Sequence, residues 1–430
     1  MSALRFVVFF AVLVAVLSAL NFFVYRWASS TFLRRRNARR WLAVLLWGSV
    51  LGMVLARVGA RVWSGMPSGP LLLVSSMVQL TVILSAFLLL PVTLAGSVVE
   101  FAQRLRRGPG VSRPGRPLPA QVADRSASAD AQQRPSTPHA GFDLGRRSLL
   151  RQAGAGSAFL IASSSSLYGA LHGRVDYAIE EVPLRIPGLA RALDGFTIVQ
   201  LSDIHIGQFV GEAELRIAAE LVAKAKPDLI VLTGDLLDND PLLAPRLGTF
   251  ARRLGPLARH GVVAISGNHD FFAGIRPFEA SLRKGGAVVL QNEARVFGDR
   301  AAGFALLGVE DVWAERQGGG PDLRRAVESL PALGGSVAAA RALPRLLLCH
   351  NPVFFEHAAG KVAAQLSGHT HGGQINLLLR PADWVLKNGW VAGRYHLAGS
   401  ELYINRGFGT VGPPARLGAP PEVSRIVLVS

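Results

Sequence analysis

Hydrophobic residues divide this chain of 430 residues into two parts with different periodicity. Three long apolar runs occupy the first hundred residues, at 6–25, 41–56 and 71–99. The first run is uncharged over twenty residues, which is enough for a helix to cross a bilayer. The third is long enough to cross with a tilt or with a kink at Pro91. The shortest run could be a buried core helix, but its two neighbours favour a bundle of membrane helices.

Beyond residue 174 the apolar runs are short and alternate with helical patterns. Four runs are typical of strands that are covered on both faces, at 196–201, 229–233, 262–266 and 346–349. Two stretches between the first three strands have apolar residues at helical spacing, at 212–224 and 242–257. The order β-α-β-α-β predicts a parallel sheet with right-handed crossovers. Two C-terminal runs, around 402–405 and 426–429, are expected to complete a second sheet.

Residues with oxygen or nitrogen ligands follow each of these four strands, and a fifth such motif lies in a Gly-rich turn. The motifs are Asp203-Ile204-His205, Gly234-Asp235-Leu236-Leu237-Asp238, Gly267-Asn268-His269-Asp270, Cys349-His350-Asn351-Pro352 and Gly368-His369-Thr370-His371-Gly372. Ligands of open α/β sheets bind just beyond the carboxyl ends of the strands, so these side chains are expected to meet in one metal site. Each motif alone could be a polar turn or a helix cap. The five motifs in this order favour the metal site.

The residue types indicate the chemistry of such a site. Carboxylate, imidazole and amide groups without a thiolate suit two divalent ions such as Mn, Fe or Zn. An aspartate can bridge two ions about 3.5 to 4 Å apart, and such a pair can bind a hydroxide and hold a phosphoryl group for hydrolysis. The leaving oxygen then needs a proton. His269 is the candidate donor, because its neighbour Asn268 can supply the amide ligand while the imidazole faces the substrate.

In this order the motifs resemble those of the calcineurin-like metallophosphoesterase superfamily, over about residues 174–430. The resemblance implies a two-sheet α/β sandwich with four layers, α/β/β/α, here preceded by a helical transmembrane region. It also implies the metal ligands, with Asp203, His205 and His371 on the first ion, Asn268, His350 and His369 on the second, and Asp235 bridging both. His269 would be the general acid, and Asp238 would orient its imidazole by hydrogen bonding.

Shorter segments are similar to a bacterial membrane-associated branch of the superfamily that is described as phosphodiesterases. They are Gln291-Asn292-Glu293, His350-Asn351-Pro352, Asn405-Arg406-Gly407-Phe408-Gly409-Thr410 and Pro420-Pro421-Glu422-Val423. This resemblance implies a phosphodiesterase or pyrophosphatase that acts near the membrane on a lipid-linked or envelope-derived phosphoester. A phosphomonoesterase or nucleotidase, and a non-catalytic metal-dependent binding or sensor module, stay open as alternatives. These residues do not indicate an oligomeric state.

Three other features favour structural over catalytic roles. Glu310-Asp311, after the apolar run 304–309, is expected to be a solvated or capping pair. Arg406 could bind a substrate phosphate or pair with a local carboxylate. Cys349, the single cysteine, cannot form an intrachain disulfide and is expected to be a small buried hydrophobic residue.

The net charge of +17 is mostly a membrane-topology signal. Residues 1–151 carry 19 arginines and 4 acidic residues, and so account for +15 of it. The nearly neutral remainder argues against nucleic-acid binding. Six arginines lie in the loop 26–40, two in 57–70 and three more at 104–107. The positive-inside rule therefore places the first loop and the end of the third span in the cytoplasm, and the N-terminus outside.

Residues between the third span and the phosphoesterase motifs predict a tether and an export segment. Pro, Gly, Ser, Ala, Gln and Arg dominate 108–139, which is typical of a flexible linker. The twin arginine Arg146-Arg147, followed by a weakly apolar stretch, resembles a Tat-type signal. The alternative is an amphipathic or domain-capping segment that leaves the enzyme in the cytoplasm. We expect a membrane region at 1–107, a linker at 108–145, a fourth span at 146–173 and an extracytoplasmic phosphoesterase domain at 174–430 of a multi-pass inner-membrane protein.

Overall fold

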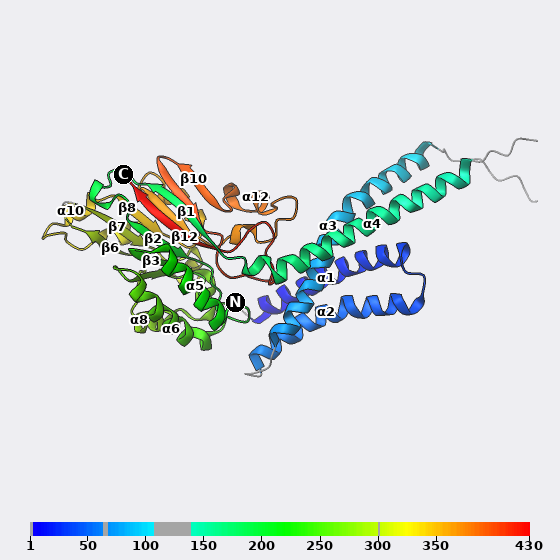
Figure 1. Cartoon of the computed structure of the whole chain (residues 1–430), viewed down its shortest axis with the longest axis horizontal. Helices are drawn as coiled ribbons and strands as arrows, with labels where there is room; N and C mark the ends of the chain where they lie inside the picture. Colours follow the sequence, from blue (N-terminus) through cyan, green and yellow to red (C-terminus); the bar gives the residue numbers. More distant parts are fainter. Residues whose placement is uncertain (1–2, 63–67, 107–138, 300–301) are drawn as a thin grey trace, which may run out of the picture. The chain divides into compact units, whose positions relative to one another are not determined.

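The computed structural model of the chain describes residues 3–62, 68–106, 139–299 and 302–430 (Figure 1). It divides into two compact units, one formed by Met1–Leu51 with Val78–Ser164 and the other by Gly52–Met77 with Ser165–Ser430. Four long helices precede the strands: α1 (Ala3–Thr31), α2 (Arg36–Val62), α3 (Ser68–Arg106) and α4 (His139–Leu171). The linker predicted at 108–145 lies outside the described residues as far as 138, and 139–145 are helical in α4.

Three of these helices are apolar enough to cross a membrane. Among the described residues the candidate spans are Ala11–Thr31, Arg36–Gly59 and Ser68–Val98, which correspond to the three apolar runs. The third span continues through Pro91 as one helix. Helix α4, which contains the twin arginine, is not among these candidates. The fourth span therefore stays a prediction.

Two six-stranded sheets form the framework of the second unit. The first has the order β1 (Ala178–Arg185), β12 (Glu422–Val429), β2 (Thr197–Leu201), β3 (Leu229–Thr233), β4 (Val262–Ile265) and β5 (Val288–Val289). The second has the order β10 (Gly393–Leu397), β11 (Ser400–Ile404), β9 (Ala364–Ser367), β8 (Arg345–Leu348), β7 (Gly303–Gly308) and β6 (Glu293–Gly298). Strands β2 to β5 are parallel, as the β-α-β-α-β pattern predicts.

Helices cover the outer face of each sheet. The helices that follow β1 are α5 (Glu212–Ala225), α6 (Ala244–Leu254), α7 (Asn268–Ala273), α8 (Ile275–Lys284), α9 (Leu323–Glu328), α10 (Val337–Arg341), α11 (Phe355–Ala358) and α12 (Ala382–Val385). One apolar cluster packs α5, α6 and α8 on the first sheet, and another packs α9, α10 and α11 on the second. A third cluster lies between the sheets. Neighbouring residues of one strand, Ile230 and Val231, enter different clusters because side chains alternate across a sheet. The predicted α/β/β/α sandwich is confirmed.

Two sequence predictions were wrong in detail. The run at 426–429 does not complete the second sheet, because β12 lies in the first sheet, parallel to β1 and antiparallel to β2. Both sheets bury apolar faces, so hydrophobicity cannot tell which sheet a strand joins. The helix predicted at 242–257 is α6 with a short 3₁₀ turn before and after it. Pro256 follows the Gly255 C-cap, and proline disfavours continuation of an α-helix.

Candidate metal centre

Side chains from five separate loops meet at the carboxyl ends of the strands. Among the described residues three groups of three could each hold a metal ion: a first group of Asp203, His205 and His371, a second of Asp235, His350 and His369, and a third of His205, Asp238 and His269 that shares His205 with the first. In each group one ligand atom per residue lies within 4.8 Å of the others. The loops follow β2, β3, β4, β8 and β9, so both sheets contribute side chains.

The carboxylate of Asp235 lies between the first and second groups. Its Oδ2 is 3.8 Å from His205 Nε2 of the first group and 3.3 Å from His350 Nε2 of the second. Within the first group, His371 Nε2 is 3.3 Å from Asp203 Oδ1 and 3.1 Å from His205 Nε2. This arrangement suits the bridging position that the sequence predicts for Asp235.

Backbone strain is concentrated at these ligands. Five of the seven predicted ligands have a left-handed backbone, with φ between 51° and 74°: Asp203, His205, Asp235, His369 and His371. Such a conformation is uncommon for residues other than glycine and is typically retained at functional sites. The surrounding hydrogen bonds hold it in place. Both carboxylate oxygens of Asp203, for example, are 3.0 Å from the backbone N of His369, which joins the first and last motifs.

Two glycines let the motif loops approach one another closely. A Cβ on Gly368 would lie 1.9 Å from Ser202 Oγ and 2.2 Å from Asp203 Oδ2. A Cβ on Gly267 would lie 2.3 Å from Asp235 Oδ1. The Gly-Asn-His-Asp and Gly-His-x-His motifs therefore need glycine because the loop backbone contacts a predicted ligand.

Three atoms predicted to hold the second ion make no hydrogen bond in the part of the chain that the structure describes. Asn268 Oδ1, His350 Nε2 and His369 Nδ1 are buried and make no hydrogen bond among the described residues. An unpaired buried polar group costs about 1–3 kcal/mol, so three together indicate a missing ligand. Amide oxygen, imidazole nitrogen and the carboxylate of Asp235 form a donor set suited to Mn, Fe or Zn. The residues therefore fit two divalent cations.

Burial and neighbouring charges act in different directions on the predicted ligands, and Asp235 holds the pKa of His350 well above its usual value. Burial lowers the pKa of His205 and of His369 to about 4, so both imidazoles are neutral at neutral pH. Burial alone would raise the pKa of Asp235, but His350 and His205 outweigh it and hold the pKa well below its usual value. Neutral imidazole and ionised carboxylate are the forms that bind a cation.

His269 lies beside the first and second groups, at the start of α7. Its backbone N donates to Asp235 Oδ1 at 2.8 Å, and its Nδ1 lies 2.9 Å from the carbonyl oxygen of Asp238. A carbonyl only accepts, so Nδ1 carries a proton and Nε2 is left for another partner. Burial would lower the pKa of His269, but Asp238 and the charge of Asp235 raise it to about 9.

The position of Asp238 differs from the sequence expectation in one respect. Its carboxylate Oδ1 is 3.6 Å from His269 Nδ1, too far for a hydrogen bond, and its side chain is 45% exposed. The main-chain carbonyl of Asp238 makes the hydrogen bond instead. Sequence reasoning assigned this bond to the carboxylate because main-chain direction within a loop cannot be read from residue types.

Two buried charged residues near the centre were missed. Asp270 accepts hydrogen bonds from the backbone N of Leu236, Leu237 and Gly267, and so joins the Asp235 loop to the Asn268 loop. Its spacing from Gly267 is that of a capping residue three positions into a helix, a signal that could have found it. Arg416 donates to the carbonyl of Gly409, and its Nη2 lies 3.3 Å from His371 Nδ1. No motif marks Arg416 in the sequence.

The three secondary predictions are confirmed. Asp311 caps a 3₁₀ turn by accepting from the backbone N of Trp313 at 2.8 Å. Arg406 pairs with Glu180 at 2.9 Å and with Glu422 at 2.8 Å, so local carboxylates occupy its guanidinium. Cys349 is fully buried in the apolar cluster beneath the second sheet, and burial raises the pKa of its thiol.

Comparison with known proteins identifies the relatives of this chain. The family profile described as calcineurin-like phosphoesterase matches residues 196–373. A transmembrane protein with metallophosphoesterase domain from Danio rerio is 30% identical over 287 residues, which cover 63% of this chain and 62% of the relative. Phosphodiesterase YaeI from Escherichia coli is 33% identical over 241 residues, 54% of this chain and 82% of the relative. An uncharacterized metallophosphoesterase from Aquifex aeolicus is 30% identical over 233 residues, which cover 53% of this chain and 82% of the relative. The chain thus spans less than two thirds of the Danio rerio relative.

Proposed function

The chain belongs to the calcineurin-like phosphoesterase family, and from this we propose that it is a membrane-anchored, two-metal phosphodiesterase or pyrophosphatase. The observation that supports the proposal most strongly is the pair of ligand groups with the Asp235 carboxylate between them. The phosphodiesterase name of the Escherichia coli relative favours a diester over a monoester substrate.

Two divalent cations, when bound, would polarise a phosphoryl oxygen and lower the pKa of a bound water. Asp203, His205 and His371 would hold one cation, Asn268, His350 and His369 the other, and Asp235 both. Asp270 accepts three backbone hydrogen bonds and so holds the loop that carries Asp235 next to the loop that carries Asn268.

His269 would donate the proton that the leaving oxygen needs. Its Nδ1 proton is held by the Asp238 carbonyl, so proton transfer to substrate takes place at Nε2. A pKa of about 9 keeps the ring protonated at neutral pH, and bound cations would bring that pKa down, towards the range where transfer is efficient. The hydrogen bond from the His269 backbone to Asp235 keeps the acid beside the metal ligands.

Hydrolysis of bis-p-nitrophenyl phosphate by the detergent-solubilised full chain tests this proposal. The protein is first treated with a chelator and then supplied with Mn, Fe or Zn. We expect turnover only with metal, and a fall of about 10²- to 10⁴-fold in kcat for His269→Ala with two metals still bound, as is typical for loss of a general acid. The exposed His396→Ala is the matched control and should keep full turnover.

The outcomes separate the alternatives. A metal-free His269→Ala protein would show that His269 is a ligand instead of an acid. Two bound metals with hydrolysis of p-nitrophenyl phosphate but not of the diester would identify a phosphomonoesterase. Two bound metals with neither activity would favour a binding or sensor module or a narrow specificity.

The same proposal places the phosphoesterase domain outside the cytoplasm of a bacterial cell, on a multi-pass inner-membrane protein. Within the second unit, Gln208 Nε2 donates to Ser68 Oγ at the start of α3, at 2.8 Å. Ser68 lies in the arginine-poor loop that the positive-inside rule puts outside, and Gln208 lies just after the first metal motif. Tat-type export through Arg146 and Arg147 would bring the folded domain to that side, where a lipid-linked or envelope-derived phosphoester would be the substrate.

A further inference from the structure

A short segment beyond the last metal motif exposes several large apolar side chains. In residues 377–387, which we call the apolar loop, the exposed fractions are 74% for Leu378, 49% for Leu379, 70% for Trp384 and 81% for Val385. The loop contains the short helix α12, drawn in orange in Figure 1. Large contiguous apolar surface is rare on a soluble domain and marks a place where something binds.

The apolar loop is braced at both ends on the turn that carries His369 and His371. Before the loop, Asn376 Nδ2 donates to the carbonyl of Gly372 at 2.9 Å. After it, Thr370 Oγ1 donates to the carbonyl of Val391. These two hydrogen bonds connect the apolar loop to the metal-binding turn. A partner that binds the loop would therefore also restrain the turn.

Local ion pairs neutralise the charges of the apolar loop. Arg380 makes two contacts of 2.8 Å with Asp383 Oδ1, and Lys387 pairs with Glu356. The surface thus offers leucine, valine and tryptophan with no excess charge. This composition suits the acyl–headgroup boundary of a bilayer, where tryptophan is enriched and leucine can be buried, better than an anionic polymer or an acidic peptide.

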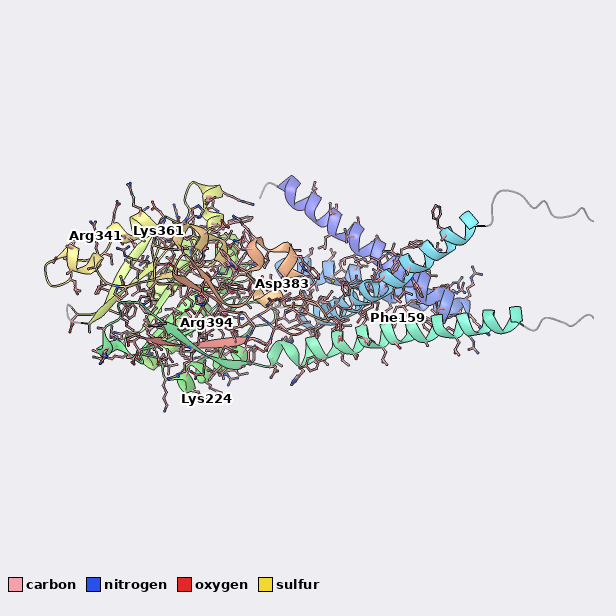
Figure 2. The ribbon with its side chains drawn as sticks, turned by 90° about the horizontal axis from the view of Figure 1, so that it is seen from above. Phe159, Lys224, Arg341, Lys361, Asp383 and Arg394 are labelled. Atoms are coloured by element: carbon pink, nitrogen blue, oxygen red, sulfur yellow. The ribbon has the colours of Figure 1, made fainter. Side chains whose placement is uncertain are left out.

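The loop also lies close to the end of a long N-terminal helix. The backbone N of Asn376 donates to the carbonyl of Leu417 at 2.8 Å. The backbone N of the adjacent Arg416 donates at 3.0 Å to the carbonyl of Gly169, two residues before the end of α4 at Leu171. In Figure 2, Asp383 of the loop and Arg341 of α10 are labelled at opposite ends of the domain. Within the second unit the apolar loop therefore lies near Gly169, at the C-terminal end of α4.

We propose that the apolar loop 377–387 docks on the lipid bilayer that holds the helices of this same chain, with Leu378, Leu379, Trp384 and Val385 below the headgroups. Docking would hold the turn with His369 and His371 at the membrane surface. Three observations support the docking: the exposed apolar side chains, the hydrogen bonds that hold the loop on the metal-binding turn, and the paired charges of the loop. The docking does not depend on which phosphoester the metal centre hydrolyses.

Spin labels on the full chain in neutral phosphatidylcholine vesicles test the docking. Leu378→Cys and Val385→Cys place a label in the loop, and Val337→Cys, 43% exposed on α10, is the matched control. Cys349 is buried, so the wild-type chain should take little label. We expect the loop labels to collide with a water-soluble nickel reagent roughly tenfold less often than the control label, and with oxygen more often, as for a site 5–10 Å into the boundary.

Two outcomes would overturn the proposal. Loop labels as accessible to nickel as the Val337→Cys label would mean that the loop is in water. Loop labels shielded from both reagents would mean that a protein surface, either a second copy or a partner, covers it. Because the charges of the loop are paired, its protection from the nickel reagent should persist in 0.5 M salt. The Debye length in that salt is on the order of five to ten times shorter than in dilute buffer, so an electrostatic attraction would be screened. Metal content equal to that of the wild type would show that the labelled variants are folded.

Discussion

Buried polar groups of the N-terminal helices and of the metal centre differ in what surrounds their unpaired atoms. Within the N-terminal helices, Gln79 Nε2 lies 2.7 Å from Ser49 Oγ, 3.1 Å from the carbonyl of Leu46 and 3.3 Å from Asn21 Oδ1. At the metal centre, Asn268 Oδ1 and His369 Nδ1 make no hydrogen bond among the described residues. The described helices also leave atoms unpaired, among them Gln79 Oε1 and Ser85 Oγ, but at the metal centre the unpaired atoms belong to predicted ligands near the Asp235 carboxylate.

The difference separates a structural network from a ligand site. Lipid offers no hydrogen bonds, so polar side chains on apolar helices pair with one another across the helices. The metal centre instead keeps unpaired atoms of Asn268, His350 and His369 near an ionised Asp235, where a bound cation can satisfy them. The comparison predicts that substitutions in the two regions affect different properties.

The largest effect is expected at the bridging carboxylate. Asp235→Asn removes the charge shared by both ligand groups, so we expect fewer than one metal per chain and a fall in kcat/KM of about 10³-fold or more. Metal analysis and diester hydrolysis measure the two effects. Asp240→Asn is the control, because asparagine also caps the 3₁₀ turn that Asp240 begins. Two metals retained by Asp235→Asn would show that this carboxylate does not bridge.

A smaller effect is expected for Asp238→Asn. The main-chain carbonyl that holds His269 Nδ1 is unchanged, and only a half-exposed carboxylate at 3.6 Å is lost. Such a charge contributes ~1 kcal/mol or less, so kcat should fall about fivefold or less with full metal content. A fall as large as that of His269→Ala would mean that the carboxylate orients the imidazole, as the resemblance implies.

The smallest effect on catalysis is expected in the helices. Gln79→Leu removes the amide that joins α1, α2 and α3, at a cost of about 1 kcal/mol. We expect a lower thermal midpoint of the solubilised chain with unchanged kcat and metal content. Ser97→Ala, which removes an exposed bond within α3, should leave the midpoint unchanged. Loss of metal in Gln79→Leu would contradict the separation of the two regions.

Much of the fold and site was predictable because the signals are local. A strand buried on both faces needs a short apolar run, and β2, β3, β4 and β8 lie within about a residue of the predicted runs. The seven predicted ligands stand directly after strands or in a Gly-rich turn, and the structure brings six of them, all except Asn268, into the first and second groups. Their metal-binding and catalytic roles stay predictions that the substitutions above test.

Other features depend on contacts between distant residues. Strand β12 inserts beside β2 because that strand has an open edge, which no property of residues 426–429 reveals. Arg416 reaches the His371 turn because the C-terminal loop folds back across it.

The sequence by itself determined the apolar spans, the parallel strands β2 to β4 and the residue types that follow them, since each depends on side-chain type and spacing along the chain. Only the tertiary structure decided that Asp235 lies between two ligand groups, that a carbonyl holds His269, and that the apolar loop is braced on the metal-binding turn. Those facts are distances between loops, and packing of the whole domain sets them.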